Sequence, residues 1–491
     1  MPGTLESRSP ATGRRLGSVE AASAETVRGL AARAAEAQPL WAAVPAAARA
    51  RYVRRASRIL LDDLDEVALL LARETGRPRT EAVLGEILPS VAGLGELADD
   101  GPGALADRRL GRPAALRGGR RAFSVLDARG VIGILGGAAS PWTEPVLEVG
   151  AALLAGNGAV LVPAAPLAGE RIRAAFLRAG IPEELLAVAH GGDAAAALAG
   201  ACSRVVSVAA TPAMGTVLVL GGAPVEQVAA SALWAAFAAG GRHPTAVSRL
   251  VCVPSVAAPL LRLLAARAEA LRVGDPTRED AEVGPLNSHD DLRVVEELVA
   301  EAVLGGADLV CGGRTAVPGL DGAFYAPAVL RRVPPEARIL REPAPGPVLA
   351  VVEARDEPEA IALVKRAEAH RDRRARGTVV SVWAGDRPKG ERVARTLGAE
   401  LSWVNDHGVV APGPALRLAR HTAARQVASR PATVAGARRL PYDPALVRAR
   451  TAATRLAHGR EQDRLRVLWR EAGPLMLAAG RVARSVLRRR R

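Results

Sequence analysis

The sequence predicts an α/β protein built on parallel sheets. Between residues 123 and 210, short runs of β-branched and aliphatic residues alternate with stretches of helical periodicity. This pattern is typical of β-α-β units with helices on both faces of a sheet. A second α/β run begins near Ala246 and extends to about residue 408. With 491 residues, of which 49% are hydrophobic, the chain has material for two or three domains with large cores.

Helices are expected between residues 22 and 75. Ser23 is a good N-cap for the first helix, and Glu25 places negative charge in its first turn, where it interacts favourably with the helix dipole. The following stretch carries apolar residues at helical spacing, and Gly76 marks its end.

Composition excludes several classes of protein. The cysteines Cys202, Cys252 and Cys311 are too few and too scattered for a disulfide framework or a metal cluster, which suits a reducing cytoplasm. The first residues show no signal-peptide pattern, and no run of about 18 apolar residues predicts a membrane span. We therefore expect a cytoplasmic protein without a metal site.

The basic charge is concentrated at the C-terminal end. The whole chain carries a net charge of +15, and residues 445–491 alone hold 13 arginines and three acidic residues, a net +10. In residues 459–491, apolar positions 475, 479, 482 and 486 fall on one helical face, and arginines 481, 484 and 488 fall opposite. This pattern fits an amphipathic helix at an anionic membrane surface, which would make the protein peripheral. A helix packed on the body with a solvated arginine face is the favoured interpretation. Nucleic acid is not expected, because no binding motif or aromatic platform accompanies the charge.

Several segments resemble the aldehyde dehydrogenase superfamily, over roughly residues 5–410. They include "LARETGRPRTEAVLGEI", "ARGVIGIL", "ALLAGNGAVLVPAA" and, as the best match, "VGDPTREDAEVGPLNSHDDLRVVEELVAEAVLGGADLVCGG". The resemblance implies an aldehyde dehydrogenase-like fold with two parallel-sheet α/β domains and a small strand extension for oligomerisation. It implies a cofactor-type domain, made of N-terminal helices at 1–105 and a Rossmann-like part at 129–225, and a catalytic-type domain at 226–405. The oligomerisation strands are expected at 106–128 and 406–440, and a basic amphipathic tail at 441–491.

The family's catalytic residues are replaced in this chain. The family oxidises aldehydes with NAD or NADP through a cysteine nucleophile, and its Gly-Gln-x-Cys motif places that cysteine at Pro244, with Arg249 at the family's arginine. Proline has neither a thiolate nor a backbone N–H. The position of the general base is Val219, which cannot accept a proton. Two residues are candidates to replace the nucleophile or base, but Cys252 sits in an apolar strand, which favours a buried, inert thiol, and His243 is a lone loop histidine without a visible partner.

The oxyanion and cofactor positions are replaced as well. The gap-free register places Ala139 at the family's oxyanion asparagine, and the alternative register places Thr143 there. The remaining cofactor positions are occupied by apolar residues, with Thr211 as the one retained hydrogen-bonding residue; these positions are Val162, Ala165, Pro343 and Pro345. The chain between Gly215 and Leu220 also lacks the family's phosphate-site helix.

These joint losses predict a pseudoenzyme that acts as a scaffold or regulatory subunit, with no cofactor. Such a chain would pair with itself or with an active relative through the oligomerisation strands. The alternative is an NAD(P)-dependent oxidoreductase that acts on an aldehyde through a non-standard site.

Overall fold

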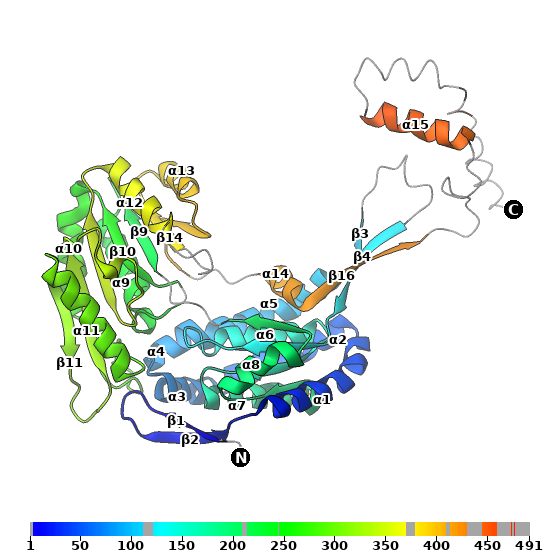
Figure 1. The fold of residues 1–491 in the computed structure, drawn as a ribbon, viewed down its shortest axis with the longest axis horizontal. Coiled ribbons are helices and arrows are strands. Elements are labelled where there is room, and N and C mark those ends of the chain that lie inside the picture. The colour runs from blue at the N-terminus through cyan, green and yellow to red at the C-terminus, as the bar shows by residue number, and fades with distance from the viewer. Residues whose placement is uncertain are drawn as a thin grey trace. The chain divides into compact units, whose positions relative to one another are not determined.

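We describe the fold from a computed structural model (Figure 1). The structure describes residues 3–110, 121–208, 214–243, 245–369, 379–408, 413–429, 444–458, 473 and 476. The chain divides into two compact units, residues 1–105 with 128–422 (unit 1) and residues 106–127 with 423–491 (unit 2).

A hairpin, five α-helices and one π-helical turn begin unit 1. These are β1 (Thr4–Arg8), β2 (Arg15–Glu20), α1 (Ala24–Ala43), α2 (Ala46–Asp62), α3 (Leu64–Thr75), α4 (Arg79–Glu81), a π-helical turn η1 (Ala82–Ile87) and α5 (Leu88–Leu105). The Ser23 side chain accepts a hydrogen bond from the N–H of Thr26, and Gly76 ends α3 with φ 73°. Both helix-end predictions are confirmed, since a serine hydroxyl satisfies a free N–H and glycine tolerates the left-handed conformation.

The first α/β layer is a four-stranded parallel sheet with strand order β7-β6-β5-β8. Its elements are β5 (Val131–Leu135), α6 (Thr143–Leu154), β6 (Gly158–Val162), α7 (Pro166–Arg178), η3 (Glu183–Leu185), β7 (Leu186–Val188), α8 (Gly192–Ala201) and β8 (Arg204–Ser207). Side chains alternate between its faces: Ile134 and Leu161 pack with α6 and α7, whereas Val131 and Val160 pack with α1 and α8. The sheet is therefore covered by helices on both faces, as predicted.

The second sheet has seven strands in the order β11-β12-β13-β10-β9-β14-β15. Its elements are β9 (Gly215–Val219), α9 (Val225–Phe237), η4 (Ala238–Gly241), β10 (Val247–Cys252), α10 (Pro254–Glu269), α11 (His289–Leu304), β11 (Asp308–Thr315), β12 (Phe324–Arg331), η5 (Arg338–Leu340), β13 (Val348–Glu353), α12 (Glu357–Ala369), β14 (Val379–Trp383), α13 (Arg387–Leu397) and β15 (Leu401–Val404). All pairs are parallel except β11 with β12. Val351 packs with α10 on one face of this sheet and Ala350 with α11 on the other.

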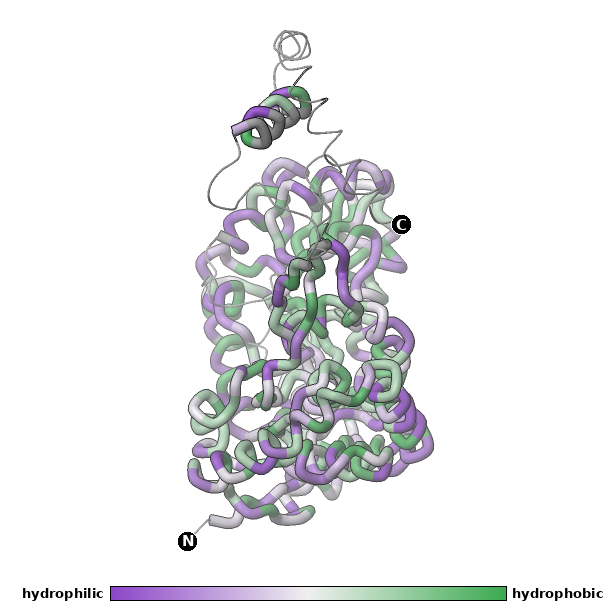
Figure 2. The backbone as a smooth tube through the Cα atoms, turned by 90° about the vertical axis from the view of Figure 1, so that its right-hand side faces the viewer, coloured by the Kyte–Doolittle hydropathy of each residue, from purple (hydrophilic) through white to green (hydrophobic). Residues whose placement is uncertain are grey.

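The chain passes from one sheet to the other within residues 208–214, between β8 and β9. Strand β9 thus lies inside the seven-stranded sheet, although the sequence analysis placed residues up to 225 in the cofactor-type domain. Figure 2 shows hydrophobic and hydrophilic residues interspersed along the described chain. No helix of the described residues is long and apolar enough to cross a membrane.

A buried ionic cluster joins α6 to α14 (Pro414–His421). Arg417 contacts Glu148 at 2.6 Å and Glu144 at 2.9 Å, and Nε2 of His421 lies 2.5 Å from Glu148. The side chains of Glu148 and His421 are 0% exposed. Burial opposes ionisation of Glu148, but the hydrogen bond with His421 and the charges of His421 and Arg417 lower its pKa below the usual value. Glu148 is therefore ionised, and its charge is compensated within the cluster.

Asn157 fixes the two places where the chain borders unit 2. Its Oδ1 accepts hydrogen bonds from the N–H groups of Arg129 (2.6 Å) and Gly130 (3.1 Å). Its Nδ2 donates to the carbonyl oxygen of His421 at 3.0 Å, and the residue is completely buried.

Unit 2 contains a three-stranded sheet with order β16-β4-β3 and a further helix. The elements are β3 (Arg108–Arg109), β4 (Arg121–Ala128), β16 (Thr422–Ser429) and α15 (Pro444–His458). The predicted amphipathic positions 475, 479, 482 and 486 lie outside the described residues, as do residues 409–412 and 430–440 of the predicted oligomerisation segment 406–440.

Candidate functional site

The loop predicted to stand at the family's nucleophile segment follows α9 and leads into β10. Ala239, Gly240 and Gly241 all have positive φ, at 53°, 61° and 76°. A Cβ added at Gly241 would lie 2.4 Å from the carbonyl oxygen of Gly346, so only glycine fits there without movement. The loop is thus packed tightly against the segment that contains Pro343 and Pro345. Pro244 itself lies outside the described residues.

Two charged side chains hold this loop by its backbone. The Glu81 carboxylate accepts a hydrogen bond from the N–H of Ala239, and Nε of Arg242 donates to the Ala239 carbonyl oxygen at 2.9 Å. Arg242 also donates to Oδ1 of Asn287. Burial raises the pKa of Glu81 and lowers the pKa of Arg242 to about 10. These contacts stabilise a left-handed alanine, which would otherwise be an unfavourable conformation.

His243 is part of the packing of the loop. It is 8% exposed; its Nδ1 accepts a hydrogen bond from the Thr245 N–H at 3.2 Å, and its ring lies 5.4 Å from that of Trp234. Burial, helped by the charge of Arg77, lowers the pKa of His243 to about 3. A neutral imidazole with so low a pKa is a poor proton acceptor near neutral pH, so His243 is not suited to be a general base.

A second imidazole, His407, braces the same loop. Its Nε2–H donates to the carbonyl oxygen of Thr245 at 3.1 Å, so that its Nδ1 accepts the hydroxyl proton of Ser381 at 2.6 Å. Ser381 is 0% exposed in the middle of β14. A hydroxyl–imidazole pair is the arrangement of an activated nucleophile, but no substrate reaches a serine buried inside a sheet. The pair connects β14 and the residues after β15 to the loop.

Val219, at the position of the general base, is a core residue. It is the last residue of β9, it is 0% exposed, and it pairs with Cys252 on one side and Trp383 on the other. Its side chain packs in the hydrophobic core of the seven-stranded sheet.

The described thiols are not activated. Cys252 is completely buried, and burial, with the nearby charge of Glu353, raises its pKa to about 12. Burial raises the pKa of Cys202 to about 11 and also raises that of Cys311. Nucleophilic cysteines need a lowered pKa, so none of the three is prepared for attack on a carbonyl.

The oxyanion position lies on the loop between β5 and α6. The carbonyl oxygen of Ala139 accepts a hydrogen bond from Nη2 of Arg77 at 2.5 Å. In the alternative register, Thr143 donates its hydroxyl to Glu86 at 2.8 Å. Neither position presents a free side-chain donor.

Arg77 and Glu86 form the buried pair that positions this loop. Their side chains are 3% and 2% exposed and lie 2.8 Å apart. Glu86 also accepts hydrogen bonds from the N–H groups of Trp142 (3.3 Å) and Thr143 (2.7 Å), which begin α6. The sequence analysis missed both residues, although they fall in the segment "LARETGRPRTEAVLGEI" that carried the resemblance.

The residues at the end of β6 do not fit an adenosine ribose. Val162 and Ala165 are each 4% exposed and buried, and Pro163 and Ala164 lie between them. A Cβ added at Gly136 would lie 3.1 Å from Pro163 and from Ala164, so the adjacent loop packs closely on this segment. Ribose hydroxyls are usually recognised by polar or charged side chains, and these four residues supply none. Thr211 lies outside the described residues.

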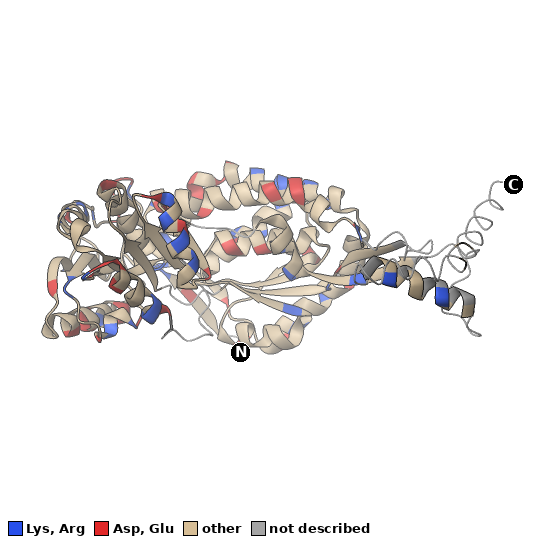
Figure 3. Cartoon of the chain, turned by 90° about the horizontal axis from the view of Figure 1, so that it is seen from above, with Lys and Arg blue, Asp and Glu red and all other residues tan. Residues whose placement is uncertain are grey.

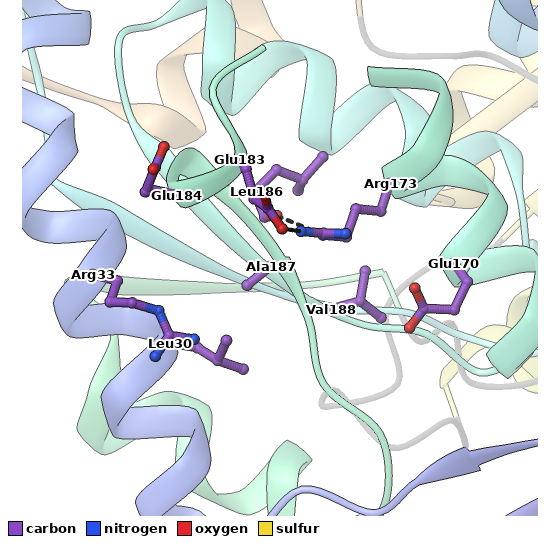
Figure 4. A pocket seen from close by; sticks show the side chains of 9 residues that line it. All are labelled: Leu30, Arg33, Glu170, Arg173, Glu183, Glu184, Leu186, Ala187 and Val188. Atoms are coloured by element: carbon purple, nitrogen blue, oxygen red, sulfur yellow. Dashed lines mark hydrogen bonds and ion pairs between the residues drawn. The ribbon is translucent and has the colours of Figure 1, made fainter. Parts of the chain in front are cut away.

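A pocket of about 400 Å³ opens elsewhere, at the edge strand β7 (Figure 4). Arg173 donates to Glu183 at 2.8 Å and to the carbonyl oxygen of Leu186 at 3.1 Å within it. Arg33 on α1 and Glu170 on α7 lie on opposite walls. None of the positions predicted from the sequence lines this pocket.

Comparisons with known proteins agree with the fold. The model of the aldehyde dehydrogenase family matches residues 2–216 and 201–415. The betaine aldehyde dehydrogenase of Cereibacter sphaeroides is 27% identical over 426 residues, which cover 82% of this chain and 85% of that protein.

Solved structures match over most of their length. PnpE from Pseudomonas sp. WBC-3 has a TM-score of 0.78 at 22% identity, covering 87% of this chain and 94% of its own. A methylmalonate-semialdehyde dehydrogenase, described as putative, from Sinorhizobium meliloti 1021 in complex with NAD has a TM-score of 0.78 at 23% identity, covering 87% and 94%. The two-sheet architecture, the match of the family model to most of the chain and these relatives lead to one conclusion: the chain belongs to the aldehyde dehydrogenase family.

Proposed function

We propose that this chain is a non-catalytic member of its family that serves as a scaffold or regulatory subunit. The observation that carries the proposal is the site itself, where the nucleophile position is Pro244 and the base position is the buried Val219. Covalent oxidation of an aldehyde needs a thiolate to form a thioester and a base to activate water. The three thiols present have raised pKa values and stand at other positions.

The cofactor side of the site supports the same proposal. Each charge-assisted hydrogen bond to a ribose hydroxyl is typically worth about 1.5–3 kcal/mol. With Val162 and Ala165 in place of charged residues, two such contacts are lost. The loop supports, in contrast, are intact, because Arg77, Glu86 and Glu81 still hold the backbone of both site loops. A retained framework without reactive groups suits a protein that contributes surfaces to an assembly.

The test is direct. Purified protein is titrated with NAD and NADP by calorimetry and assayed by nucleotide absorbance with betaine aldehyde and with short, long and aromatic aldehydes. The betaine aldehyde dehydrogenase of Cereibacter sphaeroides serves as the positive control. We expect no micromolar binding and no turnover, and we expect Pro244→Cys alone to restore neither, since Val219 supplies no base.

The second candidate is an NAD(P)-dependent oxidoreductase that works through a non-standard site. Its support is that relatives in both comparisons are named as dehydrogenases, one of them solved with NAD. Micromolar cofactor binding, or steady turnover that is lost in His243→Ala or Cys252→Ala, would establish this candidate and overturn the first.

The scaffold role also predicts a partner. We expect the chain to assemble with itself or with an active relative through the strands of unit 2. Light scattering of the purified protein, followed by co-expression with an intact dehydrogenase from the same organism, distinguishes the two assemblies. A strictly monomeric protein that leaves the activity of the relative unchanged would contradict this role.

A further inference from the structure

The two units carry very different net charges. Unit 2 has 91 residues with 23 arginines and six acidic residues, a net charge of +17. Unit 1 has 400 residues with 43 basic and 45 acidic residues, a net charge of −2. The excess positive charge of the protein thus belongs to unit 2 alone. A charge density of this kind attracts anionic partners and is screened by salt.

The described arginines of unit 2 are exposed. Arg108 and Arg109 on β3 and Arg448 and Arg455 on α15 all face solvent. Helix α15 contains no acidic residue over Pro444–His458, and Figure 3 shows its basic residues without acidic neighbours on the helix. Within the described part of unit 2, one ion pair is formed, between Arg425 and Asp127 at 2.6 Å. Among the described arginines of unit 2, Arg108, Arg109, Arg448 and Arg455 are therefore available to meet a partner.

Large apolar side chains are exposed among these arginines. Leu110 is 36% exposed, Val427 is 38%, Val447 is 46% and Met476 is 76%. Phe123 is the single aromatic residue in the described part of unit 2, and it is half-buried. Proteins that bind single-stranded nucleic acid combine basic charge with exposed aromatic platforms, whereas interfacial membrane binding combines basic charge with exposed aliphatic side chains.

We propose that unit 2 binds the surface of an anionic membrane. The arginines contact the phosphate and carboxylate groups of the lipids, and the exposed aliphatic side chains enter the headgroup region. Unit 1, which is nearly neutral, does not contribute. This inference concerns where the protein is held in the cell and does not depend on whether unit 1 is catalytic.

The test uses full-length protein and sedimentation or flotation with vesicles. Phosphatidylcholine vesicles are compared with and without phosphatidylserine. We expect binding only to the anionic vesicles, and we expect it to be lost as ionic strength rises from about 0.1 M to about 1 M, where the Debye length falls from about 10 Å to about 3 Å.

Matched variants assign the binding to unit 2. One variant replaces Arg108, Arg109, Arg448 and Arg455 with glutamine. Each arginine near an anionic leaflet contributes about fivefold in affinity, so the variant should bind roughly 600-fold more weakly. The control makes the same charge change in unit 1, at exposed arginines of α1, α2 and α10: Arg28, Arg51, Arg58 and Arg262. The control variant should bind like the original protein.

Three results would overturn the proposal. The first is that the protein ignores anionic vesicles at low salt. The second is that both variants lose affinity equally, which would indicate a general charge effect. The third is tighter binding to single-stranded or duplex DNA or to RNA than to anionic vesicles at equal salt, which would assign unit 2 to nucleic acid.

Discussion

Replacing Glu148 with alanine should destabilise unit 1 strongly. The side chain is 0% exposed and is the shared partner of Arg417 at 2.6 Å, Arg420 at 2.9 Å and His421 at 2.5 Å. After its removal, Arg417 keeps Glu144 at 2.9 Å, but the completely buried His421 loses its partner for Nε2. Breaking a buried ionic contact from one side typically costs about 3–5 kcal/mol.

A matched control separates burial from charge. Glu183→Ala removes a carboxylate that contacts Arg173 at a comparable 2.8 Å, but that carboxylate is 75% exposed. Exposed ion pairs contribute about 0–1 kcal/mol, so this variant should be nearly neutral.

Equilibrium urea unfolding, followed by tryptophan fluorescence, measures both free energies of unfolding. Because domains are stable by only about 5–15 kcal/mol, a loss of 3–5 kcal/mol shifts the midpoint visibly. If Glu148→Ala costs no more than Glu183→Ala, the ionic cluster does not hold α14 to α6 and our reasoning is wrong.

Three further outcomes follow from the same structure. The lowered pKa of Glu148 stabilises the folded protein. This contribution is fully present above the unfolded pKa near pH 4.5 and is lost as pH falls through the folded pKa. In Glu148→Gln, the thermal unfolding midpoint should therefore depend less on pH in the acid range. The pKa is about 11 for Cys202 and about 12 for Cys252, so at most about one Cys202 thiol in a thousand is ionised at pH 8. Ellman's reagent should therefore label the native protein slowly and the urea-unfolded protein at once. Rapid labelling of the native protein would contradict the raised pKa values of these thiols. Asn157→Ala leaves two N–H groups and a carbonyl oxygen without their partner, so it should cost about 3 kcal/mol in urea unfolding, and a cost below about 1 kcal/mol would show that these groups find other partners.

Much of the fold follows from local patterns in the sequence. Ser23 and Gly76 mark helix ends because capping depends on neighbouring residues, and the alternating runs became strands and helices in the expected order. The point at which the chain leaves the four-stranded sheet and enters the seven-stranded sheet was harder to predict. Strand β9 is a short apolar run, and such a run does not tell which of two parallel sheets it will join.

The replaced site positions were assigned from motif spacing and stay predictions, whereas the contacts around them could not be predicted from the sequence. The contacts of Glu86 with Trp142 and Thr143 bridge 56 and 57 residues, and those of Glu148 with Arg417 and His421 bridge 269 and 273. A charged residue in a helix usually faces solvent, so the sequence gives no local sign that these carboxylates are buried. Only the tertiary structure shows that they position the loops and α14.

The hydrogen bonds of Asn157 have an evolutionary consequence. One side chain secures both Gly130, just after the first segment of unit 2, and His421, just before the second. A module whose attachment points are fixed by the host core can change its sequence without rebuilding that core. Selection can thus act on an accessory segment and an inherited framework separately. A lineage that gave up its ancestral chemistry would still have a well-folded carrier on which a new surface can diversify.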